Sequence, residues 1–250
     1  TLEQLRELSE SDCDARIHIK IDTGMHRQGI MPGEVRDAIQ LLQASRLSLE
    51  GICSHFADAD GATDEFTNRQ ISTWNASVQE FRTAFPDIRY WHIAATAGIR
   101  LSKSIDANVV RLGKGLYGIN PIQRWPIDLK PVMEMRTVIC AVRTIPAGER
   151  VGYNGTFETT RQVRIATVPV GYFEGVDRRL SNKGSYIVRG IACPIVGRIS
   201  MNISSIDITE VPDVHIGEVV TVISSDRTAP NSIENIARLC ETITYDIVVG

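Results

Sequence analysis

The chain has 250 residues, of which 43% are hydrophobic and 23% charged, and its formal net charge is −3. This composition is typical of a globular protein with one large or two ordinary domains, and it lacks the basic excess of a nucleic-acid-binding protein. No apolar run approaches the ~18 residues that a membrane-spanning helix needs.

The first residues, Thr1-Leu2-Glu3 onward, predict a helix. They are charged and lack the apolar centre of a secretory signal peptide, and the chain does not begin with methionine. The cysteines are odd in number and contain no Cys-x-x-Cys pair, which favours free thiols in a reducing cytoplasm over a disulfide framework or a zinc site. They are Cys13, Cys53, Cys140, Cys193 and Cys240.

Residues 1–125 alternate short apolar strands with helical patterns. Apolar residues of the longest helix recur on one face, as an amphipathic helix requires. Alternation of this kind predicts parallel βα units, and polar loops after the strands are typical of the active face of a (β/α)8 barrel. We expect strands at 17–21, 47–53, 91–95 and 107–111, and helices at 33–47 and 63–85.

The barrel-like part is short. A full (β/α)8 barrel takes ~250 residues, whereas about 125 residues supply only about four βα units. A half-barrel would leave sheet edges open. We therefore expect the sequence to be the C-terminal part of a barrel whose N-terminal part is missing.

From about Pro131 the pattern changes to β-rich runs that are separated by Gly, Pro and Asn turns, with one short helix at 232–240. This pattern predicts a mostly antiparallel β-domain. We expect a partial barrel at 1–128 and the β-domain at 129–250, joined by a linker between Pro126 and Pro131.

Candidate site residues lie at or just after the end of each expected barrel strand. They are Arg27, His55, Thr96, Arg111 and Gly113. Each one alone is more simply explained as a structural residue, and the Gly-bearing turn "RLGKG" is a weak anion-binding signal. Because the carboxyl ends of barrel strands meet at one face, the set together predicts a functional site.

The stretch "SHFADAD" also permits a metal interpretation, since His55, Asp58 and Asp60 carry nitrogen and oxygen ligands. No second carboxylate or histidine cluster completes the shell. A site without metal is therefore favoured, and a metal-dependent barrel hydrolase stays open as an alternative.

Two tyrosines stand out in the second half. Tyr153 precedes Asn154-Gly155, a dipeptide typical of tight hairpin turns. Tyr245 lies in the apolar run "TITYDI", which we expect to be a buried strand.

Seven stretches, taken in order, resemble the alanine racemase family. They are "KIDTGMHRQG", "SHFADAD", "RLGKGLYG", "VGYNGTF", "VPVGY", "GRISMN" and "TITYDI". The resemblance runs from about Ala15 to Gly250 and implies a barrel followed by a β-domain that binds pyridoxal 5′-phosphate (PLP). It also implies a cytoplasmic homodimer with active sites shared between subunits, which interconverts L- and D-alanine by a two-base mechanism and supplies D-alanine for peptidoglycan.

The resemblance assigns three catalytic residues. Tyr153 resembles the tyrosine that enters from the partner subunit as one of the two bases, and His55 resembles the histidine bonded to it. Arg111 resembles the arginine that contacts both this histidine and the pyridine nitrogen of PLP. Arginine is always a donor and keeps its proton, so it should leave that nitrogen unprotonated.

Other positions resemble binding residues. Arg27 resembles an arginine near the phenolic oxygen of PLP and the substrate carboxylate, and Met201 a residue whose main chain contacts that carboxylate. Lys20 resembles a lysine that is carbamylated in some members. The phosphate cradle implied by the resemblance consists of Thr96, Gly113, Lys114 and Tyr245.

The sequence departs from the family pattern at three places. Ala95 replaces an asparagine that usually precedes the hydroxyl of Thr96, and Asn202 replaces the usual aspartate in "GRISMN". No lysine lies in a stretch like "VKANAYG", which holds the Schiff-base lysine that serves as the other base. The lysines are Lys20, Lys103, Lys114, Lys130 and Lys183.

These departures leave alternatives to an alanine racemase. Tyr245 favours alanine, since relatives that racemise serine tend to place a smaller polar residue there, but a serine or broad-specificity racemase stays open. The absent lysine motivates a third possibility, a non-catalytic fragment of the fold.

Overall fold

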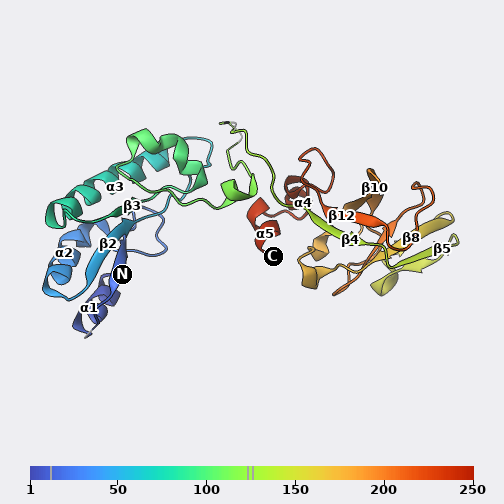
Figure 1. Ribbon diagram of the computed structural model, residues 1–250, viewed down its shortest axis with the longest axis horizontal. Helices are drawn as coiled ribbons and strands as arrows, with labels where there is room; N and C mark the ends of the chain where they lie inside the picture. Colours follow the sequence, from blue (N-terminus) through green and yellow to red (C-terminus); the bar gives the residue numbers. More distant parts are fainter. Residues whose placement is uncertain (12, 123, 126) are drawn as a thin grey trace. The chain divides into compact units, whose positions relative to one another are not determined.

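The computed structural model describes the whole chain except Asp12, Gln123 and Pro126 (Figure 1). One proline of the expected linker, Pro126, thus lies outside the described residues. The chain divides into two compact units, Thr1–Leu129 and Lys130–Gly250.

The first unit is built on a parallel sheet whose strands lie in the order β1-β2-β3. The strands are β1 (Arg16–Lys20), β2 (Ser48–Cys53) and β3 (Tyr90–His92). The helices are α1 (Leu2–Glu10), α2 (Val35–Ala44) and α3 (Glu65–Ala84), with 3-10 turns η1 (Pro32–Glu34), η2 (Thr96–Ser104) and η3 (Lys114–Tyr117). Helices α2 and α3 lie along one side of the sheet in Figure 1, as expected for βα units.

Side chains alternate across the sheet. Ile19 and Ile52 are buried in the core together with Trp74 and Phe81 of α3. Because neighbouring residues of a strand point to opposite faces, His18 stands on the face away from this core. The sheet thus has one apolar face, which packs on the helices, and one face that carries polar groups.

The strand predicted at 107–111 is not formed. The carbonyl of Trp91 accepts hydrogen bonds from two successive amides, Asn108 at 3.1 Å and Val109 at 3.2 Å, and the amide of Arg111 donates to Ala94 at 3.0 Å. Two amides on one carbonyl break the even spacing of a parallel ladder. The segment nevertheless runs beside the end of β3 and so brings Arg111 to it.

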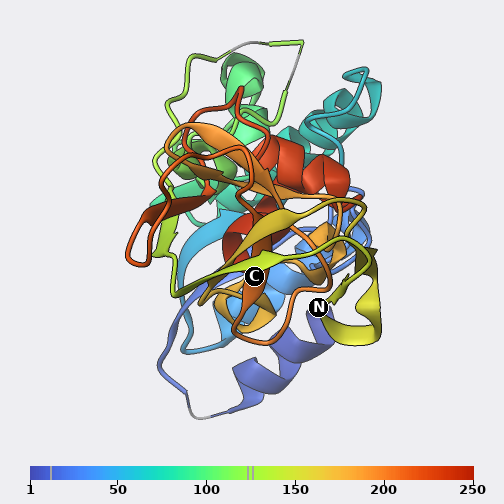
Figure 2. The same ribbon diagram turned by 90° about the vertical axis from the view of Figure 1, so that its right-hand side faces the viewer.

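The second unit is built on twisted antiparallel ribbons, coloured yellow-green to red in Figure 2. Its sheets have the strand orders β10-β9-β12-β4, β11-β8-β5 and β6-β7. The strands are β4 (Met135–Val138), β5 (Ala141–Ile145), β6 (Arg150–Val151), β7 (Phe157–Glu158), β8 (Val163–Val168), β9 (Ser185–Val188), β10 (Ile191–Pro194), β11 (Ser204–Asp207) and β12 (Val219–Ile223). Neighbouring strands in these sheets pair antiparallel, as the sequence predicts.

Helices and turns complete this unit. They are η4 (Tyr153–Gly155), η5 (Tyr172–Glu174), η6 (Arg178–Leu180), α4 (Ile233–Leu239) and α5 (Thr244–Val249). The predicted strand around Tyr245 is wrong, because the residue lies in α5. Thr242 donates to the Asp246 carboxylate four residues on, and only Ile247 of α5 is buried. A short apolar run does not distinguish a strand from a helix, and this run became a helix.

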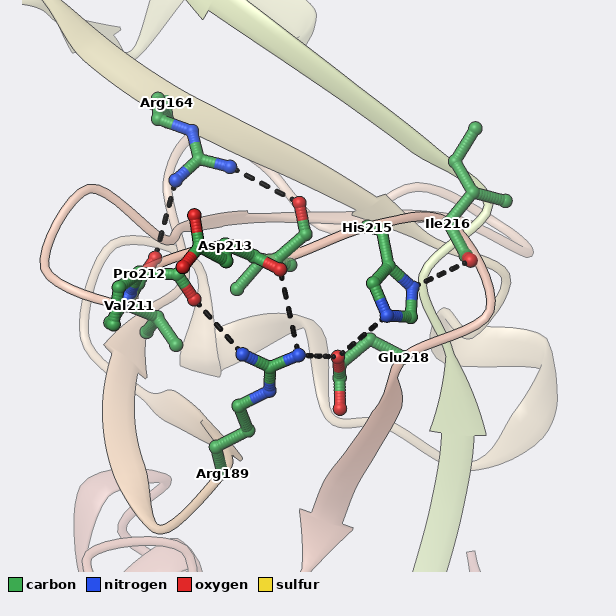
Figure 3. A network of polar contacts seen from close by, with 9 residues as sticks. Arg164, Arg189, Val211, Pro212, Asp213, His215, Ile216 and Glu218 are labelled. Atoms are coloured by element: carbon green, nitrogen blue, oxygen red, sulfur yellow. Dashed lines mark hydrogen bonds and ion pairs between the residues drawn. The ribbon is translucent and has the colours of Figure 1, made fainter.

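A polar network holds one loop of the second unit in place (Figure 3). Arg164 donates to the carbonyls of Val211 and Val214 at 3.2 and 3.1 Å. Arg189 donates to the carbonyl of Pro212 at 3.0 Å and pairs with Glu218. These bonds satisfy carbonyls that have no strand partner, so the network has a structural role.

Among the described residues, no helix is both long enough and apolar enough to cross a membrane.

Candidate active site

The loop after β1 is shaped by Asp22. Its carboxylate accepts hydrogen bonds from the amides of Gly24 at 2.9 Å and His26 at 3.0 Å. Burial alone would raise the pKa of Asp22, but these amides outweigh it and lower the pKa. A Cβ on Gly29 would lie 2.6 Å from the Asp22 amide nitrogen, so the loop closes only with glycine there. The loop presents Arg27 as an exposed side chain.

A buried polar cluster supports the loop after β2. The Ser54 hydroxyl donates to the Ile21 carbonyl at 2.7 Å and lies 3.0 Å from the Thr23 hydroxyl. The amide of Gln70, a fully buried residue of α3, donates to Thr23 at 3.0 Å and to the His55 carbonyl at 3.1 Å. Buried amides are stable only when bonded, so Gln70 ties the backbone of His55 to α3.

Arg111 is the most heavily bonded side chain at this end of the sheet. Its Nη1 contacts His92 Nδ1 and donates to the His92 carbonyl at 3.2 Å. Its Nη2 faces the carbonyls of Ser54 at 2.7 Å and Ile93 at 3.1 Å, and His55 Nδ1 at 2.9 Å. Among the described residues, only the Nε–H of this guanidinium has no acceptor.

The Arg111 contact also defines the state of His55. Guanidinium groups donate and do not accept, so His55 Nδ1 must carry a lone pair. Neutral His55 therefore bears its proton on Nε2. Burial lowers the pKa of His55, and the positive charges of Arg111, Arg27 and Lys20 lower it further. His55 is thus held as a neutral ring with one N–H donor that points away from Arg111.

Thr96 organises the "RLGKG" turn. Its buried hydroxyl oxygen accepts from the amides of Gly113 at 3.4 Å and Gly115 at 3.1 Å. A Cβ on Gly115 would lie 2.9 Å from the Thr96 methyl, so the backbone approaches as closely as glycine allows. The two amides fix the Thr96 oxygen, and the O–H of the hydroxyl is left to donate to an anion.

The structure brings several predicted residues together. The predicted residues Lys20, Arg27 and His55, together with Ser54, line one small concavity. Lys114 lies on the neighbouring turn, where its Nζ is 3.8 Å from the Asp60 carboxylate.

The metal interpretation of "SHFADAD" finds no support in the described residues. His55 faces Arg111, and Asp60 faces Lys114. Within that part of the chain, no three His, Cys, Asp or Glu side chains are grouped so that they could hold a metal ion.

The residues of the second unit stand apart from this pattern. Tyr153 is 67% exposed and lies in the turn between β6 and β7. Asn154 and Gly155 adopt positive φ of 62° and 54°, as the Asn-Gly hairpin signal predicts. The turn lifts the Tyr153 ring into solvent, where it bonds to no described residue.

The "GRISMN" backbone packs closely on the "VPVGY" loop. The Met201 carbonyl accepts from the Phe173 amide at 2.9 Å, and the side chain is 50% exposed. A Cβ on Gly171 would lie 2.4 Å from that carbonyl oxygen. Asn202, a departure from the family pattern, donates to Glu174 at 2.7 Å. Tyr245, half-buried in α5, belongs to this unit as well.

Sequence reasoning missed Gln70, His92 and His18. Gln70 had a signal, because it lies on the apolar face of α3 between Phe66 and Trp74, where an amide must bond to something buried. The contacts of His92 left no signal in the sequence, since they join residues of different strands and loops.

A parallel βα sheet with cationic groups and donors at its carboxyl ends, followed by an antiparallel β-unit, is the arrangement expected of part of a (β/α) barrel joined to a β-domain. Family models agree: residues 1–121 match "Alanine racemase, N-terminal domain" and residues 132–250 match "Alanine racemase, C-terminal domain". The chain belongs to the alanine racemase family.

Individual relatives point the same way. The alanine racemase of Syntrophobacter fumaroxidans is 36% identical, with 98% of this chain and 67% of the relative covered. The alanine racemase structure of Clostridium difficile 630 is 29% identical, with a TM-score of 0.88 over 99% of this chain and 66% of that one. The structure from Bartonella henselae, described with covalently bound pyridoxal phosphate, is 28% identical with a TM-score of 0.82, over 99% and 67%.

The family confirms the expected fold class, a partial (β/α)8 barrel followed by a mostly antiparallel β-domain. The chain spans about 64% of the length of several relatives.

Proposed function

We propose that the full-length protein carrying this chain is a PLP-dependent racemase that interconverts L- and D-alanine with two bases. The observation that carries the proposal is Arg111, whose guanidinium is held by five acceptors and leaves only its Nε–H unused among the described residues. A donor that is fixed, always protonated and unpaired in this way suits the pyridine nitrogen of PLP.

The residues fit the rest of PLP as well. The Thr96 hydroxyl can donate to a phosphate while its oxygen accepts from the Gly113 and Gly115 amides, and Lys114 adds a cationic side chain on the same turn. Arg27 is an exposed guanidinium on the same concavity as His55, which suits the phenolic oxygen and a substrate carboxylate. Lys20 lines this concavity too, where a carbamylated lysine would orient Arg27.

When bound, PLP draws electrons from the amino-acid Cα and so makes its proton acidic. The chain supplies one proton carrier, the phenol oxygen of Tyr153, which takes the proton from one face of Cα or returns it. The Nε2–H of neutral His55 stabilises the phenolate oxygen by donating to it, and Arg111 keeps His55 in that tautomer. The Met201 main chain holds the substrate carboxylate.

The other base is not assigned within this sequence, because none of the five lysines lies in a context like that of the family's Schiff-base lysine. We propose that the active protein is a homodimer in which Tyr153 of a second copy serves His55 and Arg111. The exposure of Tyr153 and Met201, 67% and 50%, supports this arrangement.

We place the enzyme in the cytoplasm, where D-alanine would enter peptidoglycan synthesis. The support is chemical: all five cysteines are free thiols, as in a reducing compartment. The substrate is alanine rather than serine because Tyr245 is large and half-buried, in place of a small polar residue.

The test is to incubate the purified full-length protein with PLP and L-alanine and to measure D-alanine with a D-amino-acid oxidase assay. We expect D-alanine to reach the level of L-alanine, with serine turned over at least tenfold more slowly. Arg111→Leu should abolish most of the rate, while Arg161→Leu, which removes an exposed arginine paired with Glu210, should not. A wild-type protein that binds PLP but forms no D-alanine contradicts the proposal.

A further inference from the structure

Two histidines, His92 and His18, extend the contacts of Arg111 along the polar face of the sheet. His92 at the end of β3 meets Nη1 of Arg111 through its Nδ1. The Nε2 of His92 lies 3.1 Å from Nδ1 of His18 on β1. The His18 ring stacks on Tyr90, with 5.7 Å between ring centroids and 21° between planes. A row of rings thus runs across β1 and β3 and ends at the guanidinium.

The direction of every bond in this row follows from Arg111. Because the guanidinium only donates, His92 Nδ1 must be a lone pair, and neutral His92 carries its proton on Nε2. That proton points at His18 Nδ1, which must then accept. Donation runs outward from Arg111 to His92 to His18, and it runs in parallel from Arg111 to His55. Both rings that touch Arg111 are therefore held in the same tautomer.

The backbone between the histidines leaves room for this row. Gly51 of β2 is the register partner of His18, and a Cβ there would lie 2.6 Å from His18 Cε1. Any other residue at this position would displace the ring. The glycine, the stacking on Tyr90 and the bond to His92 hold the His18 ring from three sides.

We propose that His92 is a positioning residue for Arg111 and that His18 fixes the His92 ring in the tautomer that this role requires. With Nη1 held by His92 and Nη2 held by Ser54, Ile93 and His55, the guanidinium cannot turn, and its Nε–H keeps one direction. Without the His92 ring, Nη1 keeps only the backbone carbonyl of that residue as acceptor, so the guanidinium loses one of its five acceptors and its plane is held less tightly. The consequence for catalysis rests on the proposed function, whereas the tautomer does not.

The tautomer can be read directly in the full-length protein without cofactor. Two-bond ¹H–¹⁵N correlation spectra at pH 7 distinguish a protonated ring nitrogen from a lone pair, and the signals of His92 are assigned by their loss in His92→Asn. We expect His92 to be neutral with its proton on Nε2, and Arg111→Leu to let the other tautomer appear. A wild-type His92 with its proton on Nδ1, or unchanged signals in Arg111→Leu, overturns the proposal.

Activity of the PLP-loaded protein gives the second readout. His92→Leu removes both ring nitrogens and should lower kcat at least tenfold with little change in KM for alanine. His92→Asn places an amide oxygen near the former Nδ1, so it should recover kcat to within about threefold of wild type. His215→Asn, at a 70% exposed surface histidine, is the matched control and should change nothing. Equal losses in His92→Leu and His92→Asn would mean that the ring only fills space.

The two proposals fail in different ways. A protein that shows the expected His92 tautomer but forms no D-alanine contradicts the proposed function and leaves the tautomer in place. A protein that racemises alanine, with His92 in the other tautomer and with full kcat in His92→Leu, contradicts the positioning role alone. Thermal unfolding of each variant checks that a change in kcat does not come from loss of fold.

Discussion

The two units of the chain present their candidate site residues in opposite ways. In the first unit, Arg111 and His55 are partly buried, and their bonds to strands and loops of the same unit hold them in one orientation. In the second unit, Tyr153 stands in solvent on a hairpin turn and bonds to no described residue. The candidate residues of the first unit are thus fixed by bonds within that unit, whereas the Tyr153 ring is exposed.

This difference has a physical basis. A charged guanidinium that must keep one direction needs several acceptors, and parallel strands supply carbonyls at their carboxyl ends. A phenol that moves a proton needs only one oxygen at the right place. A rigid hairpin that carries the tyrosine is therefore enough to position that oxygen. Variants in the first unit should therefore change stability and activity together, whereas Tyr153 variants should change activity alone.

The largest expected effect is that of Tyr153→Phe. Removal of one positioned proton carrier typically costs 10²–10⁴-fold in rate, so kcat of the full-length protein should fall by at least about 10²-fold. The melting temperature should change little, because the hydroxyl bonds to nothing in the described part of its own unit and the variant loses at most the one proposed bond to His55 of a second copy. The measurements are a D-alanine assay and thermal unfolding.

Tyr186→Phe is the matched variant for this test. Its hydroxyl is buried and lies 3.2 Å from the Ser204 hydroxyl, so its removal should cost about 1 kcal/mol of stability and leave kcat near wild type. If Tyr153→Phe were to lower stability while Tyr186→Phe lowered kcat, the contrast between exposed and buried tyrosines would be wrong.

The next effect concerns the room that Gly51 gives to His18. Gly51→Ala should push the His18 ring aside and break its bond to His92, at a cost of about 1 kcal/mol in the free energy of unfolding. All three tryptophans of the chain, Trp74, Trp91 and Trp125, lie in the first unit, so tryptophan fluorescence in urea reports on this unit and not on the second.

Gly33→Ala provides the control for that measurement. A Cβ at this position meets nothing within 4 Å, so the unfolding free energy should stay within about 0.5 kcal/mol of wild type. Equal losses in the two variants would show that the cost at Gly51 is a backbone effect and not the displacement of His18.

The same residues show which features a sequence can predict. Strand ends that carry Arg27, His55 and Thr96 could be predicted, because apolar alternation followed by a polar turn is a local pattern. The hairpin at Asn154-Gly155 was local too. The row from Arg111 to His92 to His18 was not predictable, because it joins three segments whose register depends on sheet pairing. Tyr245 was assigned to a strand by mistake, because the run "TITYDI" is too short for its length to distinguish a strand from a helix.

A third test uses pH and the burial of His92. Burial, together with the charge of Arg111, lowers the pKa of His92 to about 4 from an ordinary value near 6.5. Between these values the unfolded chain takes up a proton on this ring and the folded chain does not. Stability is therefore unaffected above pH 6.5 and is lost progressively as the pH falls towards 4.

With a discount for the solvent that reaches this half-buried ring, the first unit should be about 1 kcal/mol less stable at pH 5 than at pH 7.5 through His92 alone. His92→Asn has no titratable ring and should lack this part of the pH dependence in urea unfolding followed by tryptophan fluorescence. An identical pH dependence in wild type and His92→Asn would place the loss in other groups.

The smallest expected effect lies in the second unit, at Asn202. Its amide donates to Glu174, and this bond is the main cause of the lowered pKa of the Glu174 carboxylate. Asn202→Asp would restore the residue usual in the family but would set two carboxylates face to face, so the pKa of Glu174 should rise. Because a carboxylate with a lowered pKa stabilises the fold only above that pKa, the variant should be slightly less stable at pH 7 and indistinguishable from wild type near pH 3.

Glu174 is exposed, so the loss of stability should be small beside that in Gly51→Ala. Thermal unfolding at the two pH values measures this loss. A variant that is more stable than wild type at pH 7 would show that Asn202 is held by something other than Glu174.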